Sequence, residues 1–183
     1  MTYEIIETSL QEILILKPKI YNDRRGYFFE SFNQQDFYNA TGSSDLFVQD
    51  NQSQSVKGVL RGLHYQIPNP QGKLVRVTKG IAYDVVVDIR RSSANFGKWT
   101  SIELSSENNY QLWVPVGFAH GFMAISESVE FMYKTTDYWS PDCEQCLLWS
   151  DPEIGISWPR VDSLLINDKD RNGKRLSEIK CFD

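Results

Sequence analysis

Short apolar stretches separated by turn residues run along most of the chain. They are rich in β-branched and aromatic side chains, which favour strands, and they cover residues 12–18, 27–32, 73–80, 81–90, 99–105, 110–116, 120–126 and 129–139. From Asp151 to Asp183, polar residues are scattered more evenly, which predicts turns and short helical pieces. Many short strands and few helices in 183 residues predict an all-β sandwich or barrel.

One segment, FNQQDFYNATG, has the pattern of a helix instead. Asn33 can cap this helix, and Asp36 suits its first turn. Phe37 and Ala40 then share a face, and Gly42 can end the helix. A helix is therefore predicted between Asn33 and Gly42.

Composition and charge narrow the class of protein. A chain of 183 residues with 41% apolar content suits one globular domain, residues 1–183. The 19 basic and 24 acidic residues give a net charge of -5 without long like-charge blocks, which argues against nucleic acid or an anionic membrane as a partner. The stretch MTYEIIETSL lacks the features of a signal peptide, and no apolar stretch reaches the roughly 18–20 residues of a membrane span. We expect a cytoplasmic protein.

The three cysteines, Cys143, Cys146 and Cys181, are an odd set and do not resemble a disulfide framework, in agreement with a reducing compartment. Cys143 and Cys146 form a CxxC motif. A redox motif would be expected beside a βαβ pattern, and structural zinc requires four close nitrogen or sulfur ligands; the segment SPDCEQC offers neither. The two thiols are interpreted as incidental residues near a turn.

The stretch VLRGLHYQ, residues 59–66, places an arginine, a glycine and a histidine in a strand-like run. In a regular strand, Arg61 and His64 would point to opposite faces, because side chains alternate. A bulge at Gly62 would add one residue and bring both side chains to the same interior. Alternatively, Arg61 is a solvated charge and His64 is a hydrogen-bonded core residue.

The other histidine, His120, lies in WVPVGFAHGF, where proline and glycine interrupt an apolar run. Two isolated histidines, without an HxH or HxxxH pair, do not supply the ligands of a catalytic metal, so no metal is predicted. Alternation within residues 81–90 puts Asp84 on a face with other charged residues, which is either solvated or lines a polar pocket. Tyr133 shares a face with Phe131, and a buried tyrosine hydroxyl needs a partner.

Seven motifs, in order along the chain, resemble those of the dTDP-4-dehydrorhamnose 3,5-epimerase family. They are DRRGYFFESF, FVQDNQSQS, VLRGLHYQ, QGKLVRV, WVPVGFAHGF, YKTTDYWSP and DKD, and they lie between about Ile13 and Asp170. Each motif is short, but the ordered set is specific. The resemblance implies a cupin-type double-stranded antiparallel jelly roll that works without a metal or cofactor. It also implies a homodimer in which an N-terminal strand adds to the partner's sheet, a part that the apolar alternation of EILILK would suit.

The family's substrate is dTDP-4-dehydro-6-deoxyglucose, whose C4 ketone acidifies the protons on C3 and C5. Inversion of both carbons to give dTDP-4-dehydro-L-rhamnose needs a base on one face, a proton donor on the other, and stabilisation of the enolate between them. By resemblance, His64 is the base, Asp170 holds its other nitrogen, and Tyr133 is the donor. Lys73 matches the family's lysine near the C4 oxygen, where a positive charge favours the enolate.

Other matched residues are expected to bind the substrate. Arg25 and Arg61 match positions used for the nucleotide diphosphate, since guanidinium groups pair well with phosphate oxygens. His120 is expected as a second donor to the C4 oxygen, and Asp84 is a candidate to orient it; whether it does so stays open. The remaining binding residues implied by the resemblance are Glu30, Gln49, Asn51, Glu144 and Lys169, together with Tyr138, which matches the aromatic residue that stacks on thymine.

The chain departs from the family pattern in three places. Arginines occupy positions 24 and 25, and the diphosphate role is given to Arg25 because it directly precedes Gly26. Asn167 replaces a residue that is often serine, and the loop 67–71 is short. Two alternatives stay open: an epimerase that acts only at C3 or only at C5 of a related dTDP-keto sugar, and a non-catalytic jelly roll that binds a sugar nucleotide.

Overall fold

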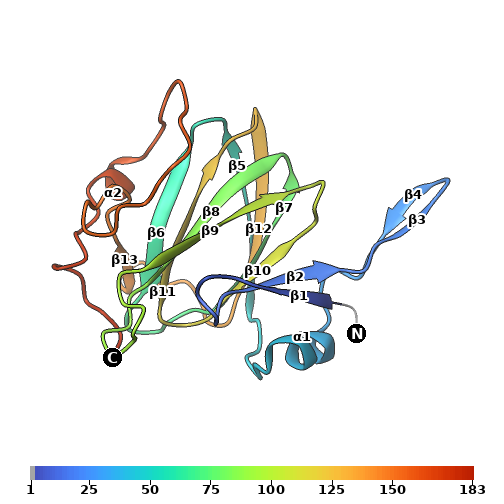
Figure 1. Cartoon of the computed structure of the whole chain (residues 1–183), viewed down its shortest axis with the longest axis horizontal. Coiled ribbons are helices and arrows are strands. Elements are labelled where there is room, and N and C mark those ends of the chain that lie inside the picture. Colours follow the sequence, from blue (N-terminus) through green and yellow to red (C-terminus); the bar gives the residue numbers. More distant parts are fainter. Residues whose placement is uncertain (1–2) are drawn as a thin grey trace.

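Two antiparallel β-sheets packed face to face form the body of the protein in a computed structural model, which describes residues 3–183 (Figure 1). The first sheet has six strands, in the order β1 (Tyr3–Glu7), β2 (Leu14–Pro18), β10 (Gln111–Val114), β7 (Lys73–Lys79), β12 (Ser128–Thr135) and β5 (Gln49–Val56). The second has five, in the order β13 (Glu144–Cys146), β6 (Leu60–Gln66), β11 (Phe118–Ala124), β8 (Ile81–Asp88) and β9 (Trp99–Ser105). From β5 to β8, and again from β9 to β13, consecutive strands alternate between the sheets, which confirms the predicted cupin-type jelly roll.

A hairpin and two short helices complete the described chain. The hairpin, β3 (Tyr21–Asp23) and β4 (Gly26–Phe28), projects away from both sheets (Figure 1). Helix α1 (Gln34–Thr41) confirms the predicted helix: Asn33 Oδ1 accepts hydrogen bonds from the N–H groups of Gln35 and Asp36, and Gly42 ends the helix with a φ of 73°. Helix α2 (Asp168–Arg171) lies near the C-terminus. Among residues 3–183, no helix is long and apolar enough to cross a membrane.

Apolar side chains fill much of the space between the sheets. Val75 and Phe131 of the first sheet pack with Val86, Ile102 and Phe122 of the second, and their burial supplies the main driving force for the sandwich. Phe122 and Phe131 stack with ring centroids 4.1 Å apart. These two rings also line the cavity described below, so the core ends where the cavity begins.

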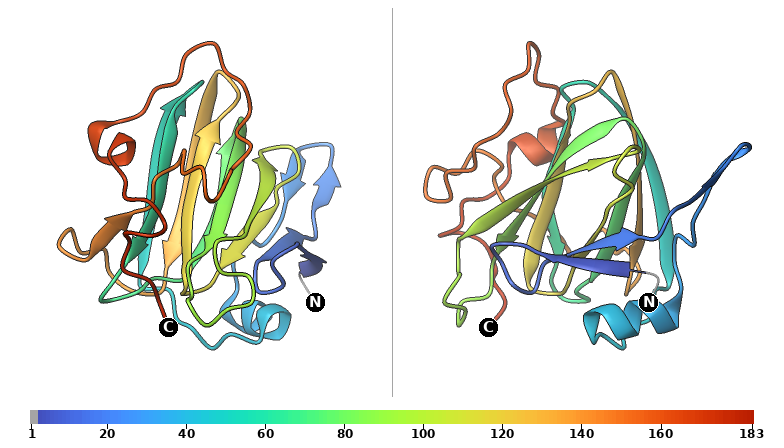
Figure 2. Two further views of the ribbon diagram at one scale, coloured as in Figure 1. Left: turned by 60° about the vertical axis from the view of Figure 1, so that its left-hand side comes forward. Right: turned by 45° about the vertical axis from the view of Figure 1, so that its right-hand side comes forward.

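The segment from Asp151 to Asp183 covers the outer face of the second sheet (Figure 2). Ile154 and Leu176 pack there against Val85 and Val87 of β8. β8 is therefore buried on both faces, which explains its nearly continuous apolar sequence. The predicted turns and short helical pieces of this segment are present, and α2 is one of them.

Four strands of the described chain lie outside the stretches that the sequence predicts as strands: β1, β3, β5 and β13. The predicted strand at 27–32 forms only the short β4. The strand from EILILK, β2, pairs with β1 along one edge and with β10 along the other. Its predicted addition to a partner's sheet is wrong, because both of its edges are already hydrogen-bonded within the chain.

The predicted bulge at Gly62 is present in β6. Arg61 and His64 are three residues apart, whereas their partners on β11 are two apart, so the register shifts between them. Gly62 has a φ of 113°, and a Cβ on it would lie 2.7 Å from the Cα of Gly121. The extra residue brings Arg61 and His64 to the same interior cavity, as the sequence predicts.

We expect Gly62→Ala to lower the free energy of unfolding by about 3 kcal/mol or more, because it adds a clash with the backbone of β11 to the strain of a positive φ. Gly26→Ala is the matched control, since Gly26 has a φ of 128° but no atom within 4 Å of the added Cβ. The control should lose only about 1–2 kcal/mol. Urea denaturation measures both, and equal losses would mean that the close approach to β11 costs nothing.

Candidate active site

A cavity of about 210 Å³ opens between the two sheets. Six of the predicted site residues meet in its lining, and they come from five strands, β6, β7, β11, β12 and β13: Arg61, His64, Lys73, His120, Tyr133 and Glu144. The rest of the lining consists of Ser53, Gln71, Gly121, Phe122, Phe131 and Trp139. The fold therefore assembles a polar site from residues that are far apart in the sequence.

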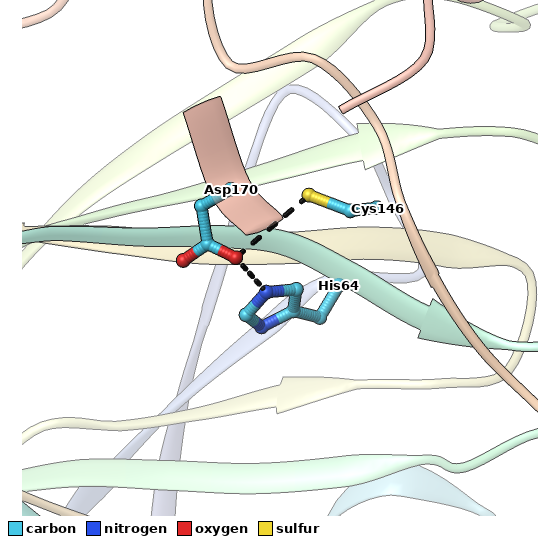
Figure 3. A group of neighbouring side chains, drawn as sticks. All are labelled: His64, Cys146 and Asp170. Carbon is cyan, nitrogen blue, oxygen red and sulfur yellow. Dashed lines mark hydrogen bonds and ion pairs between the residues drawn. The ribbon is translucent and has the colours of Figure 1, made fainter. Parts of the chain in front are cut away.

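His64 and Asp170 form a close hydrogen-bonded pair (Figure 3). His64 Nε2 lies 2.6 Å from Asp170 Oδ1, while the N–H of Gly62 donates to Asp170 Oδ2 at 3.1 Å. Because a carboxylate only accepts hydrogen bonds, it fixes a proton on Nε2 and leaves Nδ1 as the basic nitrogen of the neutral ring. That nitrogen lies 3.9 Å from Oε1 of the cavity residue Glu144.

Two ionised carboxylates flank His64. Burial raises the pKa of Asp170, but hydrogen bonds from His64 and from the N–H of Gly62, together with nearby positive charge, hold it below its usual value. Burial also raises the pKa of Glu144. The hydrogen bond from Lys169, together with the charges of His64 and Lys169, outweighs this effect and holds the pKa of Glu144 below its usual value. Both groups stay negative at neutral pH and stabilise positive charge on the imidazole ring.

Tyr133 stands on the sheet that faces His64, because β12 belongs to the first sheet and β6 to the second. Burial and the charge of Glu144 raise the pKa of its phenol, while Arg61 acts in the opposite direction. The phenol therefore keeps its proton at neutral pH. The cavity thus presents an acceptor on one wall and a proton donor on the other.

Lys73 reaches from the first sheet towards the second. Its Nζ donates to the carbonyl oxygen of His64 at 3.2 Å. Burial lowers the pKa of this ammonium to about 8, although Glu144 and Asp84 oppose the shift. The group is mostly charged at neutral pH, and a fixed positive charge in a pocket of this kind acts strongly on a nearby anionic oxygen.

His120 forms a second histidine–carboxylate pair. Its Nε2 lies 2.9 Å from both carboxylate oxygens of Asp84, which is fully buried. Burial raises the pKa of Asp84 despite the opposing effects of His120 and Lys73. The charged face of residues 81–90 therefore points into the protein at this position, and Asp84 lies where it can orient His120.

Strand β5 supplies polar side chains beside the cavity. Arg61 Nε donates to Ser55 Oγ at 3.0 Å, and Arg61 Nη2 donates to the carbonyl of Gln54 at 3.2 Å. Gln49 Nε2 donates to Asn51 Oδ1 at 2.9 Å. The predicted residues Gln49 and Asn51 thus lie on β5, the strand that accepts the hydrogen bonds from Arg61. Neither of them reaches the cavity lining.

Four other predicted binding residues also lie outside the lining. Arg25, on the projecting hairpin, is 84% exposed in its side chain and pairs with Asp23, and Glu30 is exposed shortly after the hairpin. Tyr138 is 64% exposed at the loop after β12. Lys169 extends from α2 and pairs with Glu144. The chain therefore does not bring Arg25 or Glu30 to its own cavity.

Several cavity residues were missed in the sequence. Trp139, whose Nε1 donates to Glu144 Oε2 at 3.2 Å, follows Tyr138 in a matched motif, so a signal for it was available. Ser53 and Gln71 stand in the matched motifs FVQDNQSQS and QGKLVRV, so the same signal was available for them, and the strand arrangement shows that they line the cavity.

Cys146 is closer to the histidine pair than its interpretation as an incidental thiol implies. Its Sγ lies 4.0 Å from Asp170 Oδ1 (Figure 3). Burial and the charge of Asp170 raise the pKa of this thiol to about 12, so it is protonated at neutral pH and is a poor nucleophile.

Comparisons with known proteins agree with this geometry. The family profile described as dTDP-4-dehydrorhamnose 3,5-epimerase matches residues 7–178. A protein of that name from Pseudomonas aeruginosa is 52% identical over 174 residues, which are 95% of this chain and 96% of the relative.

Solved structures give the same result. A crystal structure of dTDP-6-deoxy-D-glucose-3,5-epimerase from Legionella pneumophila, in complex with dTDP-4-keto-L-rhamnose, superposes with a TM-score of 0.95 at 47% identity, covering 97% of this chain and 94% of that one. A 3'-monoepimerase from Streptomyces bikiniensis, in complex with dTDP-quinovose, gives a TM-score of 0.88 at 31% identity, covering 93% of this chain and 87% of that one. With a matching family profile and near-complete coverage of relatives about half identical in sequence, the chain belongs to the dTDP-4-dehydrorhamnose 3,5-epimerase family.

Proposed function

We propose that this chain inverts C3 and C5 of dTDP-4-dehydro-6-deoxyglucose to form dTDP-4-dehydro-L-rhamnose. The observation that carries the proposal is the His64–Asp170 pair on one wall of the cavity, with Tyr133 on the facing sheet. Family membership supports the same substrate. The three free cysteines and the nucleotide-sugar substrate favour the cytoplasm as the place of action.

The reaction begins with His64. Nδ1 takes the proton from C3 or C5, the C–H electron pair moves into an enolate, and the imidazole becomes imidazolium. Asp170 at 2.6 Å and Glu144 at 3.9 Å stabilise the new positive charge. General-base catalysis of this kind is typically worth about 10²–10⁴-fold in rate.

The enolate carries its negative charge on the C4 oxygen. Lys73 supplies a positive charge for that oxygen. His120, held by Asp84 through Nε2, would donate a hydrogen bond to it from Nδ1 in the imidazolium form, in which both ring nitrogens carry protons. Tyr133 then donates its proton to the carbon from the opposite side, which inverts the centre. The phenol and the imidazole are restored by proton exchange with water before the second carbon reacts.

An epimerase that acts at one carbon only is a second candidate, because the Streptomyces bikiniensis 3'-monoepimerase shares the fold. The two functions use the same base and the same donor. They differ in the number of carbons that exchange hydrogen with solvent. Incubation of the dTDP-keto sugar in deuterated water should label both C3 and C5. Label at one carbon would favour the epimerase that acts at a single carbon. Label at neither carbon would favour a non-catalytic binding protein.

We further propose a homodimer in which the hairpin of one copy lies beside the cavity of the other. Tyr27 and Phe28 on this hairpin are 62% and 69% exposed, and clustered exposed aromatic residues mark interaction surfaces. Arg25 lies between the two strands of the hairpin and away from the cavity of its own chain. A partner's cavity would give this guanidinium a diphosphate to bind.

We expect His64→Ala to abolish exchange at both carbons and Tyr133→Phe to separate exchange from inversion. The Phe variant keeps the base, so deuterium should still enter the recovered keto sugar from the His64 side. Inverted product should fall by about 10²–10⁴-fold, because the donor is lost. Nuclear magnetic resonance follows both processes in one sample. Equal loss of exchange and inversion in Tyr133→Phe would contradict the two-sided scheme.

The pH profile should report on Lys73. Because the pKa of this ammonium is lowered to about 8, its charge is lost as pH rises through that value, and kcat/KM of the wild type should fall above about pH 8. Lys73→Met should be slower by about 10²–10³-fold at pH 7, by analogy with the loss of one oxyanion-stabilising donor. The variant should also lack the fall above pH 8. An unchanged fall in Lys73→Met would assign it to another group.

Subunit complementation tests the place of Arg25. Arg25→Ala and His64→Ala should each show little activity, whereas a mixture refolded together should recover activity, because one site of the mixed dimer combines an intact His64 with the partner's intact arginine. Each variant refolded alone is the control. No recovery in a sample that sediments as a dimer would place Arg25 in the site of its own chain or outside any site.

A further inference from the structure

Three different metal-binding side chains converge behind the cavity. An imidazole nitrogen of His64, Cys146 Sγ and an Asp170 carboxylate oxygen all lie within 4.8 Å of one another, and Nε2 is the nitrogen that contacts Asp170 (Figure 3). Among residues 3–183, this is the one group of three or more histidine, cysteine or acidic side chains whose ligand atoms lie close enough together to hold an ion. The proposed proton transfers use His64 and Asp170, but they give no role to Cys146.

We propose that His64, Cys146 and Asp170 form an inhibitory site for a divalent zinc ion. One imidazole nitrogen, one thiolate and one carboxylate oxygen are the donors that Zn²⁺ prefers, and three protein ligands leave a fourth position for water. Mg²⁺ prefers an octahedral set of oxygen ligands, so the site should discriminate against it.

The backbone already holds the three donors on one side of the sheet. Cys146 and His64 are directly paired across β13 and β6, so their side chains share a face. Asp170 is fixed by two further contacts: its Oδ2 accepts from the N–H of Gly62, and its own N–H donates to Asn167 Oδ1 at 2.7 Å. Ligands oriented by such outer contacts bind a metal more tightly than free ones.

Small movements convert the observed arrangement into a zinc site. Bonds of 2.0–2.3 Å place tetrahedral donors about 3.3–3.8 Å apart. His64 Nε2 and Asp170 Oδ1, now at 2.6 Å, would separate slightly, while Cys146 Sγ, now 4.0 Å from Oδ1, would approach. Cys146 lies on the edge strand β13 and is partly exposed, which gives the ion a route to the site.

Binding would stop the proposed reaction at its first step. The zinc ion binds Nε2 in place of its proton, which moves through water to Nδ1, and the thiol of Cys146 releases its proton to water as the zinc–sulfur bond forms. Nδ1 then carries the ring proton and has no free lone pair with which to accept a proton from the sugar. The inhibition rests on the proposed role of His64, whereas the binding does not.

The test compares Cys146→Ser with Cys181→Ser, a matched change at another free, partly exposed cysteine. Zinc chloride should inhibit the wild type and Cys181→Ser equally. Cys146→Ser should keep its basal activity and need at least about tenfold more zinc for half-inhibition, since even the loss of an outer contact to a metal site costs that much. Magnesium chloride should inhibit none of the three. Equal zinc inhibition of all three proteins would overturn the site.

Cobalt(II) provides a readout that does not depend on activity. Titration of the wild type should produce a thiolate-to-cobalt charge-transfer absorption, which Cys181→Ser keeps and Cys146→Ser loses. If the wild type shows no such absorption, the metal site is wrong even where the protein epimerises its substrate. If the absorption appears in a protein that neither exchanges nor inverts the sugar, the metal site stands and the proposed function fails.

Discussion

The hydrogen bond between His64 and Asp170 is the interaction on which the rest of the site depends. It joins residues 106 positions apart, one in a central strand and one in a segment that packs outside the sandwich. A buried carboxylate is costly unless hydrogen bonds compensate for lost water, and here the imidazole and the N–H of Gly62 provide them. The bulge at Gly62 and the docking of the C-terminal segment are therefore both conditions for orienting the imidazole of His64.

A polar cavity inside a small sandwich must coexist with an apolar core. The structure divides the interior, with valine, leucine and phenylalanine side chains on one side and the cavity on the other. Within the cavity wall, polar and charged groups are held by partners: His120 by Asp84, and Arg61 by Ser55. Such pairing limits the cost of taking polar groups from water and fixes their orientation before any ligand arrives.

Packing against the core leaves a pattern of apolar residues in the sequence, whereas strands that face the site carry polar residues in its place. Strands such as β7 and β8 were predicted from apolar residues that face the core. β5 was missed because its inward positions are the polar residues Gln49, Asn51, Ser53 and Ser55, which serve the site instead of the core. The matched motifs supplied the pairing of His64 with Asp170, which no local pattern encodes. Alternation in EILILK marked a strand correctly, but it carries no information on which neighbours occupy the strand's edges.

The position of Asp170 in the chain has a consequence for the order of synthesis. Every strand of both sheets precedes it, since the last of them, β13, ends at Cys146. A ribosome therefore supplies all the residues that line the cavity before it adds the carboxylate that orients the imidazole. A nascent chain at that stage has every residue of the cavity lining but lacks the carboxylate that pairs with His64. The hydrogen bond between His64 and Asp170 can form only when the later segment docks on the second sheet, so the site is completed by the part of the chain that is made last.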